Sequence, residues 1–326
     1  MEKQISAIRK QTVAFMPLLC MTVMLLSTLS SLSAQKAAKP QPPIRLEAGR
    51  LVYTPDEQGN RVPDFSYCGY EQSELPIPTV EAVLVVPHRK GDNTARLQAA
   101  IDHVSTLIPD ADGFRGAIQL EAGTYEVSGS LTLHTDGVVL RGAGLQEGGT
   151  TLLGTGQDRA TLITIGGKND KQEAEAVEIA DSYVPVNSLQ LTVKSGSFKV
   201  GDRIIIRRLD SEAWITRLGT AHFGGGNTTL GWKLGNQILC WERTLTAVAG
   251  NKLTLDAPLT NALDPQYGIT TVSKLTWPGR ISRCGVENLH LASTVDPDNA
   301  KDENHRWNAV SLENCEHCWV RRLKVS

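Results

Sequence analysis

The stretch that decides the fold reads Ala117-Ile-Gln-Leu120, Thr124-Tyr-Glu-Val127, Ser130-Leu-Thr-Leu133, Gly137-Val-Val-Leu140, Thr151-Leu-Leu153 and Thr161-Leu-Ile-Thr-Ile165. Gly, Asp or Ser separates nearly all of these pieces. They are too short for a β-sandwich, and because no helix intervenes they do not suit a doubly wound sheet. The pattern predicts a solenoid in which each turn of about 20–25 residues adds short strands to parallel sheets over one shared core.

An amphipathic helix is predicted just before these strands. Leu97, Ala100, Ile101, Val104 and Leu107 recur at the spacing of one helix face. A single helix cannot bury such a stripe alone. We therefore expect it to close the first layer of the solenoid, which would otherwise expose apolar side chains.

The end of the chain repeats a pattern. Cys284-Gly-Val286-Glu-Asn-Leu289-His-Leu291 aligns with Cys318-Trp-Val320-Arg-Arg-Leu323-Lys-Val325, and the four matching positions are each 34 residues apart. Inward positions carry Cys or aliphatic residues and outward positions are polar, which predicts further solenoid turns over residues 261–326. The chain ends inside a predicted strand, so we expect either that a cap lies beyond the sequence or that this end pairs with another chain.

Residues 186–260 show a different strand pattern. Thr244-Leu-Thr-Ala-Val248 and Lys252-Leu-Thr-Leu255 flank Gly250-Asn251, which is typical of a β-hairpin. We interpret this region as a small antiparallel β insertion. The expected organisation is a signal peptide (1–34), a linker and N-terminal segment packing on the solenoid (35–87), N-terminal turns with the helix (88–185), the insertion (186–260) and further turns (261–326).

The opening of the solenoid resembles the pectate lyase superfamily, and most closely its rhamnogalacturonase/epimerase-like β-helix proteins. The resemblance rests on Gly91-Asp-Asn-Thr-Ala-Arg-Leu-Gln-Ala-Ala-Ile101, Ile118-Gln-Leu-Glu-Ala-Gly-Thr-Tyr125 and Val138-Val-Leu-Arg-Gly-Ala-Gly144, within roughly a quarter of the chain. It implies a right-handed parallel β-helix of the pectin-lyase type. The expected fold is therefore an all-β protein of this type, with the N-terminal capping helix and the small antiparallel β insertion that the residue patterns indicate. The motif holds no catalytic residues, and fold alone does not assign chemistry.

The first 34 residues carry the three parts of a secretory signal peptide: basic Lys3, Arg9 and Lys10, an apolar centre, and small residues before a cut after Ala34. A membrane anchor is the alternative, but Pro17 interrupts the apolar run. We expect a secreted or periplasmic protein with no stable membrane insertion after cleavage. A net charge of −2 without a basic stripe argues against nucleic acid as a partner.

The loop between the two matched turns concentrates reactive side chains. Asp302, Glu303, His305 and Arg306 could protonate or activate groups for polysaccharide hydrolysis, or supply a base and a cation for β-elimination from a uronate. They are our candidate catalytic residues, with a solvated charged loop as the alternative. Asp296, Asp298 and Asp302 could bind Ca²⁺; no other cofactor is indicated.

Aromatic residues suggest where a sugar chain would bind. We expect Trp241 and Trp307 to contact substrate, because exposed indole faces stack on sugar rings. Arg243 and His222 lie near Trp241 in the sequence and are expected to contact the same anionic sugar chain. The alternative is that the tryptophans form the core of the insertion. The expected groove lies where the loop 296–307 meets the lip that carries Trp241 and Arg243.

One further motif contains two cysteines. Cys315-Glu-His-Cys318 lacks a second ligand pair for zinc, which favours stacked buried cysteines with Cys284.

The function expected from the resemblance is that of an exported polysaccharide lyase. A glycoside hydrolase of the same fold and a non-catalytic glycan-binding β-helix, as in adhesins, remain open.

Overall fold

The computed structural model describes residues 42–223 and 230–326. The chain divides into two compact units, residues 1–54 and 55–326. In the first, β1 (Ile44–Glu47) and β2 (Arg50–Tyr53) form an antiparallel hairpin. The predicted signal peptide and residues 35–41 of the predicted linker lie outside the described residues.

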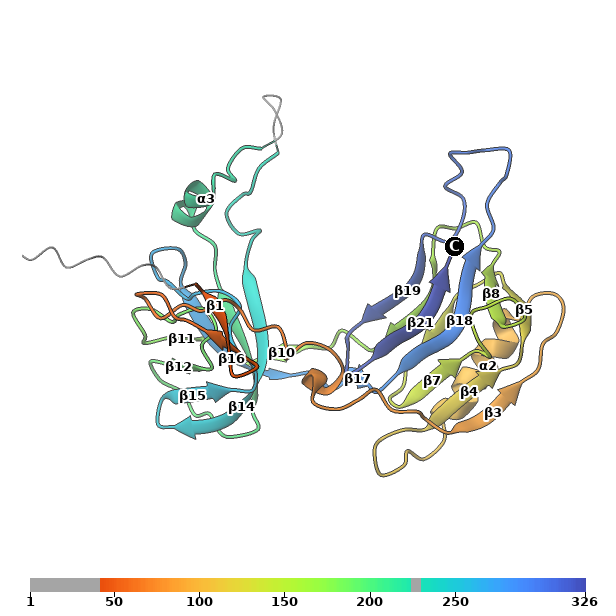
Figure 1. Cartoon of the computed structure of the whole chain (residues 1–326), viewed down its shortest axis with the longest axis horizontal. Coiled ribbons are helices and arrows are strands. Elements are labelled where there is room, and N and C mark those ends of the chain that lie inside the picture. Colours follow the sequence, from red (N-terminus) through yellow and green to blue (C-terminus); the bar gives the residue numbers. More distant parts are fainter. Residues whose placement is uncertain (1–41, 224–229) are drawn as a thin grey trace, which may run out of the picture. The chain divides into compact units, whose positions relative to one another are not determined.

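The second unit is mostly β and contains a curled parallel sheet. Five strands are paired in parallel along its first ladder, where they lie side by side (Figure 1): β3 (Ala82–Val86), β4 (Gly116–Leu120), β7 (Val138–Arg141), the first half of β18 (Gly285–Ser293) and β21 (Trp319–Val325). This pairing confirms the prediction of parallel strands within residues 117–165 and within residues 281–326 of the predicted range 261–326.

Two further ladders continue each circuit of the chain. The second joins β5 (Gly123–Val127), β8 (Thr150–Gly154) and the second halves of β18 and β21. The third joins β6 (Leu131–Leu133), β9 (Thr161–Gly166) and β19 (Asn308–Glu313), and β17 (Ile281–Ser282) pairs with β20 (Cys315–Glu316). Inward residues such as Ile118, Leu140 and Val286 share one buried core.

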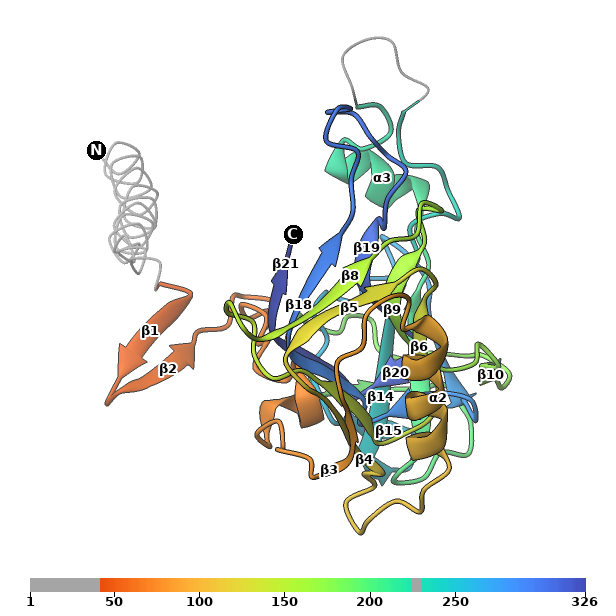
Figure 2. The same cartoon turned by 90° about the vertical axis from the view of Figure 1, so that its right-hand side faces the viewer.

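The register of the last two circuits confirms the sequence repeat. Val286 pairs with Val320, Leu289 with Leu323 and Leu291 with Val325. Gly142 fits between stacked circuits because a Cβ there would lie 2.6 Å from the Asn288 carbonyl oxygen. The predicted helix is α2 (Thr94–Ser105), which lies beside the strands in Figure 2. Its residues Leu97, Ile101 and Val104 are buried in the same core, as predicted.

An antiparallel unit interrupts the circuits between β9 and β17. Its strands are β10 (Gln172–Glu173), β11 (Val177–Glu178), β12 (Gln190–Thr192), β13 (Arg203–Arg208), β14 (Leu239–Ala249), β15 (Lys252–Leu255) and β16 (Thr270–Thr276). The hairpin of β14 and β15 turns at Gly250-Asn251, which confirms that prediction. The antiparallel strands extend on both sides of the predicted range 186–260, because β10 and β11 pair with β16, which in turn pairs with β13. Residues 270–276, which were predicted to belong to further solenoid turns, are therefore part of the antiparallel unit. This unit has its own core.

The segment before β3 crosses the outside of the first ladder. Tyr70, in the short 3-10 helix η1 (Tyr70–Ser73), packs edge-on against Trp319 with 5.4 Å between ring centres. Beside it, the buried carboxylate of Glu287 accepts hydrogen bonds from Arg141, Trp319 and Arg321. The two arginines also donate to the carbonyls of residues 77, 78 and 80, which fastens the segment to the sheet.

The cysteines described by the structure are free thiols. Cys284 is buried in the parallel core, and Cys315 and Cys318 pack against it half-buried. Hydrogen bonding to Cys284, together with burial, raises the pKa of Cys318 to about 12. This arrangement agrees with the stacked-cysteine interpretation.

Candidate functional site

The predicted catalytic loop joins β18 to β19. Asp302 accepts hydrogen bonds from the amides of Asp296 and Asn304, which hold its pKa below the usual value. Glu303 pairs with Arg159 at 3.4 Å, and His305 Nδ1 lies 2.9 Å from the carbonyl oxygen of Arg306. Asp302 therefore stays ionised and orders the loop turn, so it does not suit a general acid.

Arg306 is a correction to the sequence prediction. Its side chain is 2% exposed and pairs with Asp158 at 2.5 Å. It also donates to the carbonyls of Ser128 and Gly129. These contacts engage the guanidinium in anchoring the loop to a neighbouring turn, so Arg306 is not placed to act on a substrate.

The predicted substrate residues separate in the structure. Trp307 is exposed, and Arg159 lies 5.2 Å from its ring centre. Trp241, in contrast, is 7% exposed within the core of the antiparallel unit, and its indole nitrogen donates to Thr260 Oγ1 at 2.8 Å. The prediction of a stacking face at Trp241 is wrong, because this small β unit uses the large ring to fill its core. His222 is exposed beyond α3 (Glu212–Leu218).

Arg243 lines a polar cavity of about 170 Å³ between the antiparallel strands and the β17–β20 pair. Its guanidinium donates to the carbonyls of Glu242, Ala257 and Pro258. The loop carrying His305 borders a different cavity, and no described residue lines both. The structure therefore assigns the two segments to different cavities.

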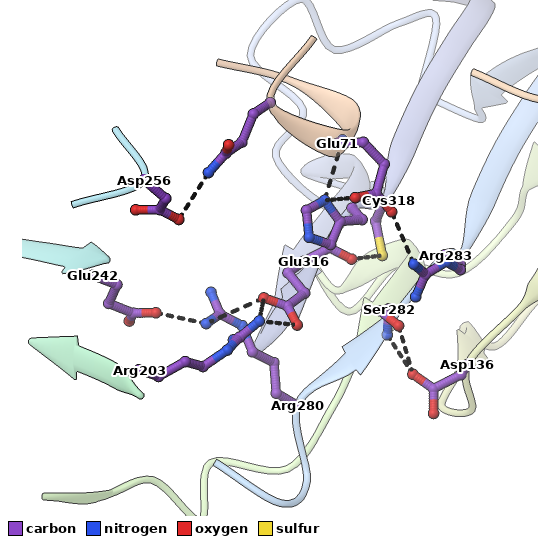
Figure 3. A network of polar contacts seen from close by, with 12 residues as sticks. Glu71, Asp136, Arg203, Glu242, Asp256, Arg280, Ser282, Arg283, Glu316 and Cys318 are labelled. Carbon is purple, nitrogen blue, oxygen red and sulfur yellow. Dashed lines mark hydrogen bonds and ion pairs between the residues drawn. The ribbon is translucent and has the colours of Figure 1, made fainter. Parts of the chain in front are cut away.

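The charges around the polar cavity largely neutralise one another. Arg203 pairs with Glu316 at 2.7 Å, and Arg280 reaches Glu242 at 2.6 Å and Glu316 at 3.6 Å (Figure 3). Gln72 donates to Asp256 at 2.9 Å. This network ties the antiparallel unit to the parallel strands and leaves few charges free for chemistry.

No group of three or more His, Cys, Asp or Glu side chains that could hold a metal occurs within residues 42–223 and 230–326. The aspartates proposed for Ca²⁺ instead accept backbone amides: Asp296 from Asp298, and Asp302 from Asp296. Over the same ranges no helix is long and apolar enough to cross a bilayer.

A groove on the outer face of the second ladder was not predicted. Thr124, Thr151, His290 and Lys324 occupy successive paired positions on β5, β8, β18 and β21. They line a cavity of about 550 Å³, whose wall is the glycine-rich loop 145–149. The sequence held a signal for it, because the 34-residue repeat already aligns His290 with Lys324 at outward positions.

His290 is the best-placed titratable group in this groove. Its Nδ1 lies 3.4 Å from Thr151 Oγ1 and its Nε2 lies 2.8 Å from Ser326 Oγ. Burial lowers the pKa of His290, and the charge of Lys324 lowers it further. Both effects favour the neutral form of the imidazole. Lys324 lies on the next strand of the ladder, and neighbouring strands are about 4.8 Å apart.

Comparison with known proteins shows limited similarity. No family model matches the chain, and no curated protein matches it. Among solved structures, the tailspike gp61 of Pseudomonas phage phi297 is 12% identical with a TM-score of 0.38, covering 70% of this chain and 30% of that one. The gp54 tailspike of Acinetobacter baumannii phage AP22, solved with a capsular saccharide, is 13% identical with a TM-score of 0.35, covering 72% and 33%.

A third similar structure is the tailspike gp49 of Pseudomonas phage LKA1, 14% identical with a TM-score of 0.32, covering 62% of this chain and 32% of that one. The chain thus spans about a third of the length of each tailspike. Membership of the pectate lyase superfamily is not shown by these comparisons.

Proposed function

We propose that this protein is an exported carbohydrate-active protein that binds an acidic polysaccharide in the groove of the second ladder and cleaves it by β-elimination. The observation that carries the proposal is the neutral imidazole of His290 beside the ammonium group of Lys324 on adjacent strands. The glycan as ligand class also follows from the resemblance of the sequence to β-helix enzymes.

The proposal includes the finer description of the fold. The parallel strands constitute a right-handed β-helix, with α2 as its N-terminal cap. Right-handedness is supported by the strong preference of crossovers between parallel strands for that hand. The capping role is supported by the burial of Leu97, Ile101 and Val104 against the first circuits.

The groove residues match the needs of β-elimination. Lys324 neutralises the carboxylate of a uronate, which makes the C5 proton more acidic. The substrate displaces the long 3.4 Å contact of Thr151 Oγ1, so that Nδ1 of His290 accepts that proton while Nε2 donates to Ser326 Oγ. The C4–O4 bond then breaks, a C4–C5 double bond forms, and the leaving oxygen takes a proton from water.

Hydrolysis by paired carboxylates is less well supported here. Of the described residues that line the groove, Glu147 is the one carboxylate. Both glycosidase mechanisms use two carboxyl groups flanking the bond. Binding without cleavage remains the second reading, because Thr124, Thr151 and Lys324 also suit simple recognition of an anionic chain.

The test is incubation with a panel of uronate-containing polysaccharides. Elimination gives an unsaturated, ultraviolet-absorbing product, and His290→Ala should lower its rate by roughly 10²–10⁴-fold. Lys324→Ala should weaken binding and also lower the rate, because the uronate carboxylate would keep its charge, whereas the exposed controls His103→Ala and Lys90→Ala should change neither. New reducing ends without ultraviolet absorption would refute elimination, and binding without product would leave a glycan-binding protein.

Export is proposed from the leader sequence. If residues 1–34 are a signal peptide, the protein recovered from outside the cytoplasm should begin at Gln35. Mass spectrometry of the recovered protein tests this, and an intact N-terminus on exported protein would contradict it.

A further inference from the structure

Arg208, at the end of β13, is a buried cation whose hydrogen-bonding capacity is mostly unused. Arg208 as a whole residue is 3% exposed. Nη1 makes two long contacts of 3.4 Å, to Asn261 Oδ1 and to the Ala262 carbonyl oxygen. Nε and Nη2 are shielded from solvent and have no hydrogen-bond partner in the part of the chain that the structure describes.

The residue paired with Arg208 shows the same feature. Thr270 on β16 lies directly opposite Arg208 in the antiparallel register, and it is 4% exposed. Its Oγ1 is also buried without a partner among residues 42–223 and 230–326. Directly opposite residues point to the same face of a sheet, with Cβ atoms about 4.5–5.5 Å apart. One face therefore holds three unpaired polar atoms close together.

The two free nitrogens of Arg208 define a particular shape. Nε and Nη2 form the lateral edge of the guanidinium, the fork that binds a carboxylate through two parallel hydrogen bonds. A buried guanidinium without such a partner is costly. Consistent with this, burial lowers the pKa of Arg208, and Asp264 opposes the shift only through charge without bonding to it. A carboxylate on the fork would supply both missing acceptors.

Aromatic rings lie beside the same guanidinium. Trp214 of α3 covers it, with 4.3 Å between Arg208 Cζ and the ring centre. Trp232 lies 5.4 Å from Trp214 between ring centres, at a tilt of 48°. Both indoles are half-buried. Indole faces pack well against the apolar faces of sugar rings, and this combination with a carboxylate fork suits a sugar that carries an acid group.

We propose that Arg208 and Thr270, with Trp214 and Trp232, form a second glycan site that binds the carboxylate of an acidic sugar. The fork takes the carboxylate, Thr270 adds a hydroxyl hydrogen bond, and the indoles contact the ring. The site shares no residue with the groove of His290 and Lys324. It takes its ligand class from the proposed function, but its existence does not depend on cleavage.

Binding at this site must move Trp214. Nε and Nη2 are closed to solvent while the indole covers the guanidinium. α3 is short, with Ile215 as its buried residue and a left-handed Gly219 at its C-terminal end. Displacement of Trp214 should change tryptophan emission, so occupation of the site has a direct optical signal.

The test uses the whole protein with sodium D-glucuronate as the probe and D-glucose and sodium acetate as comparisons. Tryptophan fluorescence and calorimetry should show binding of glucuronate that is stronger than binding of either comparison. Arg208→Lys keeps the charge but lacks the fork, and it should weaken binding by about tenfold or more. Arg217→Lys, an exposed position on α3, should leave binding unchanged.

Further variants keep the test decisive. If Arg208→Lys fails to fold, Thr270→Val should still weaken glucuronate binding, and Trp214→Phe should abolish most of the optical change. His290→Ala should leave this binding intact, so failure of the groove and failure of this site are distinguishable. Glucuronate binding that is absent, equal to acetate binding, or insensitive to both Arg208→Lys and Thr270→Val would overturn the proposal.

Discussion

Replacing Glu287 with glutamine tests whether its buried carboxylate holds the outer segment on the first ladder. The Glu287 side chain is 2% exposed and accepts hydrogen bonds from Arg141, Arg321 and the Trp319 indole. Glutamine keeps the shape and one oxygen but removes the charge. The two arginine side chains, 14% and 19% exposed, would then lose their counter-charge in a poorly solvated place.

The expected loss follows from that burial. Removing one partner of a buried ion pair costs roughly 3–5 kcal/mol, and glutamine should fall near the lower end because it can still accept one hydrogen bond. Urea unfolding should therefore show a lower midpoint for Glu287→Gln. Glu74→Gln, at an exposed position of the same segment, is the matched control and should stay within about 0.5 kcal/mol of the parent.

The pH dependence gives an independent check. Burial alone would raise the pKa of Glu287, but the hydrogen bonds from Arg321, Arg141 and Trp319 outweigh it and lower the pKa. A lowered folded-state pKa contributes stability above the unfolded pKa of about 4.3, and this contribution is lost as pH falls through the folded-state value. The stability difference between parent and Glu287→Gln should thus be full at pH 7 and shrink below about pH 4. A loss under about 1 kcal/mol at pH 7, or a difference that grows in acid, would refute this account of the network.

Three other outcomes follow from single contacts. Gly142→Ala should lower the free energy of unfolding in urea by about 1–3 kcal/mol, because its Cβ would lie 2.6 Å from the Asn288 carbonyl oxygen. An unchanged unfolding midpoint would show that the neighbouring circuit can shift to make room for the methyl group. Arg306→Ala should release the β18–β19 loop from Asp158 and Gly129 and speed tryptic cleavage after Lys301, and equal cleavage rates would show that the anchor is dispensable. Lys324→Met should raise the pKa of His290 toward its usual value without fully restoring it, because burial is the larger cause of the shift. An NMR titration that finds no change in this pKa would show that Lys324 does not influence His290, and the proposed groove chemistry depends on that influence.

Local periodicity was enough to predict the parallel circuits. Alternating apolar residues in short pieces specified the strands, and the stripe on residues 97–107 specified α2. The 34-residue repeat even gave the correct register for β18 and β21. These features depend on which face of each short element is apolar, and that information lies within a few residues.

The predicted site failed where side-chain burial mattered. Arg306 and Trp241 belong to residue types common in glycan sites, but the first anchors a loop and the second fills a core. Nothing in their neighbouring residues distinguishes these roles, because burial depends on which distant segment covers them. Asp158 and Ser128, which engage Arg306, come from turns far earlier in the chain.

The groove was not predicted because its residues are far apart in the sequence, with the antiparallel unit between them. The inserted unit separates Thr151 from His290 by 139 positions, so no repeat length relates the two circuits. They stack as neighbours because the insertion leaves and returns through adjacent chain segments, where the Lys168 amide donates to the Gly279 carbonyl at 2.7 Å and the Trp277 indole donates to the Lys168 carbonyl at 2.8 Å. These contacts close the neck of the insertion, so that the circuits before and after it can stack as neighbours. Because the proposed site at Arg208 lies in the inserted unit and the proposed groove at His290 lies on the parallel ladder, we expect substitutions at one to leave the other intact.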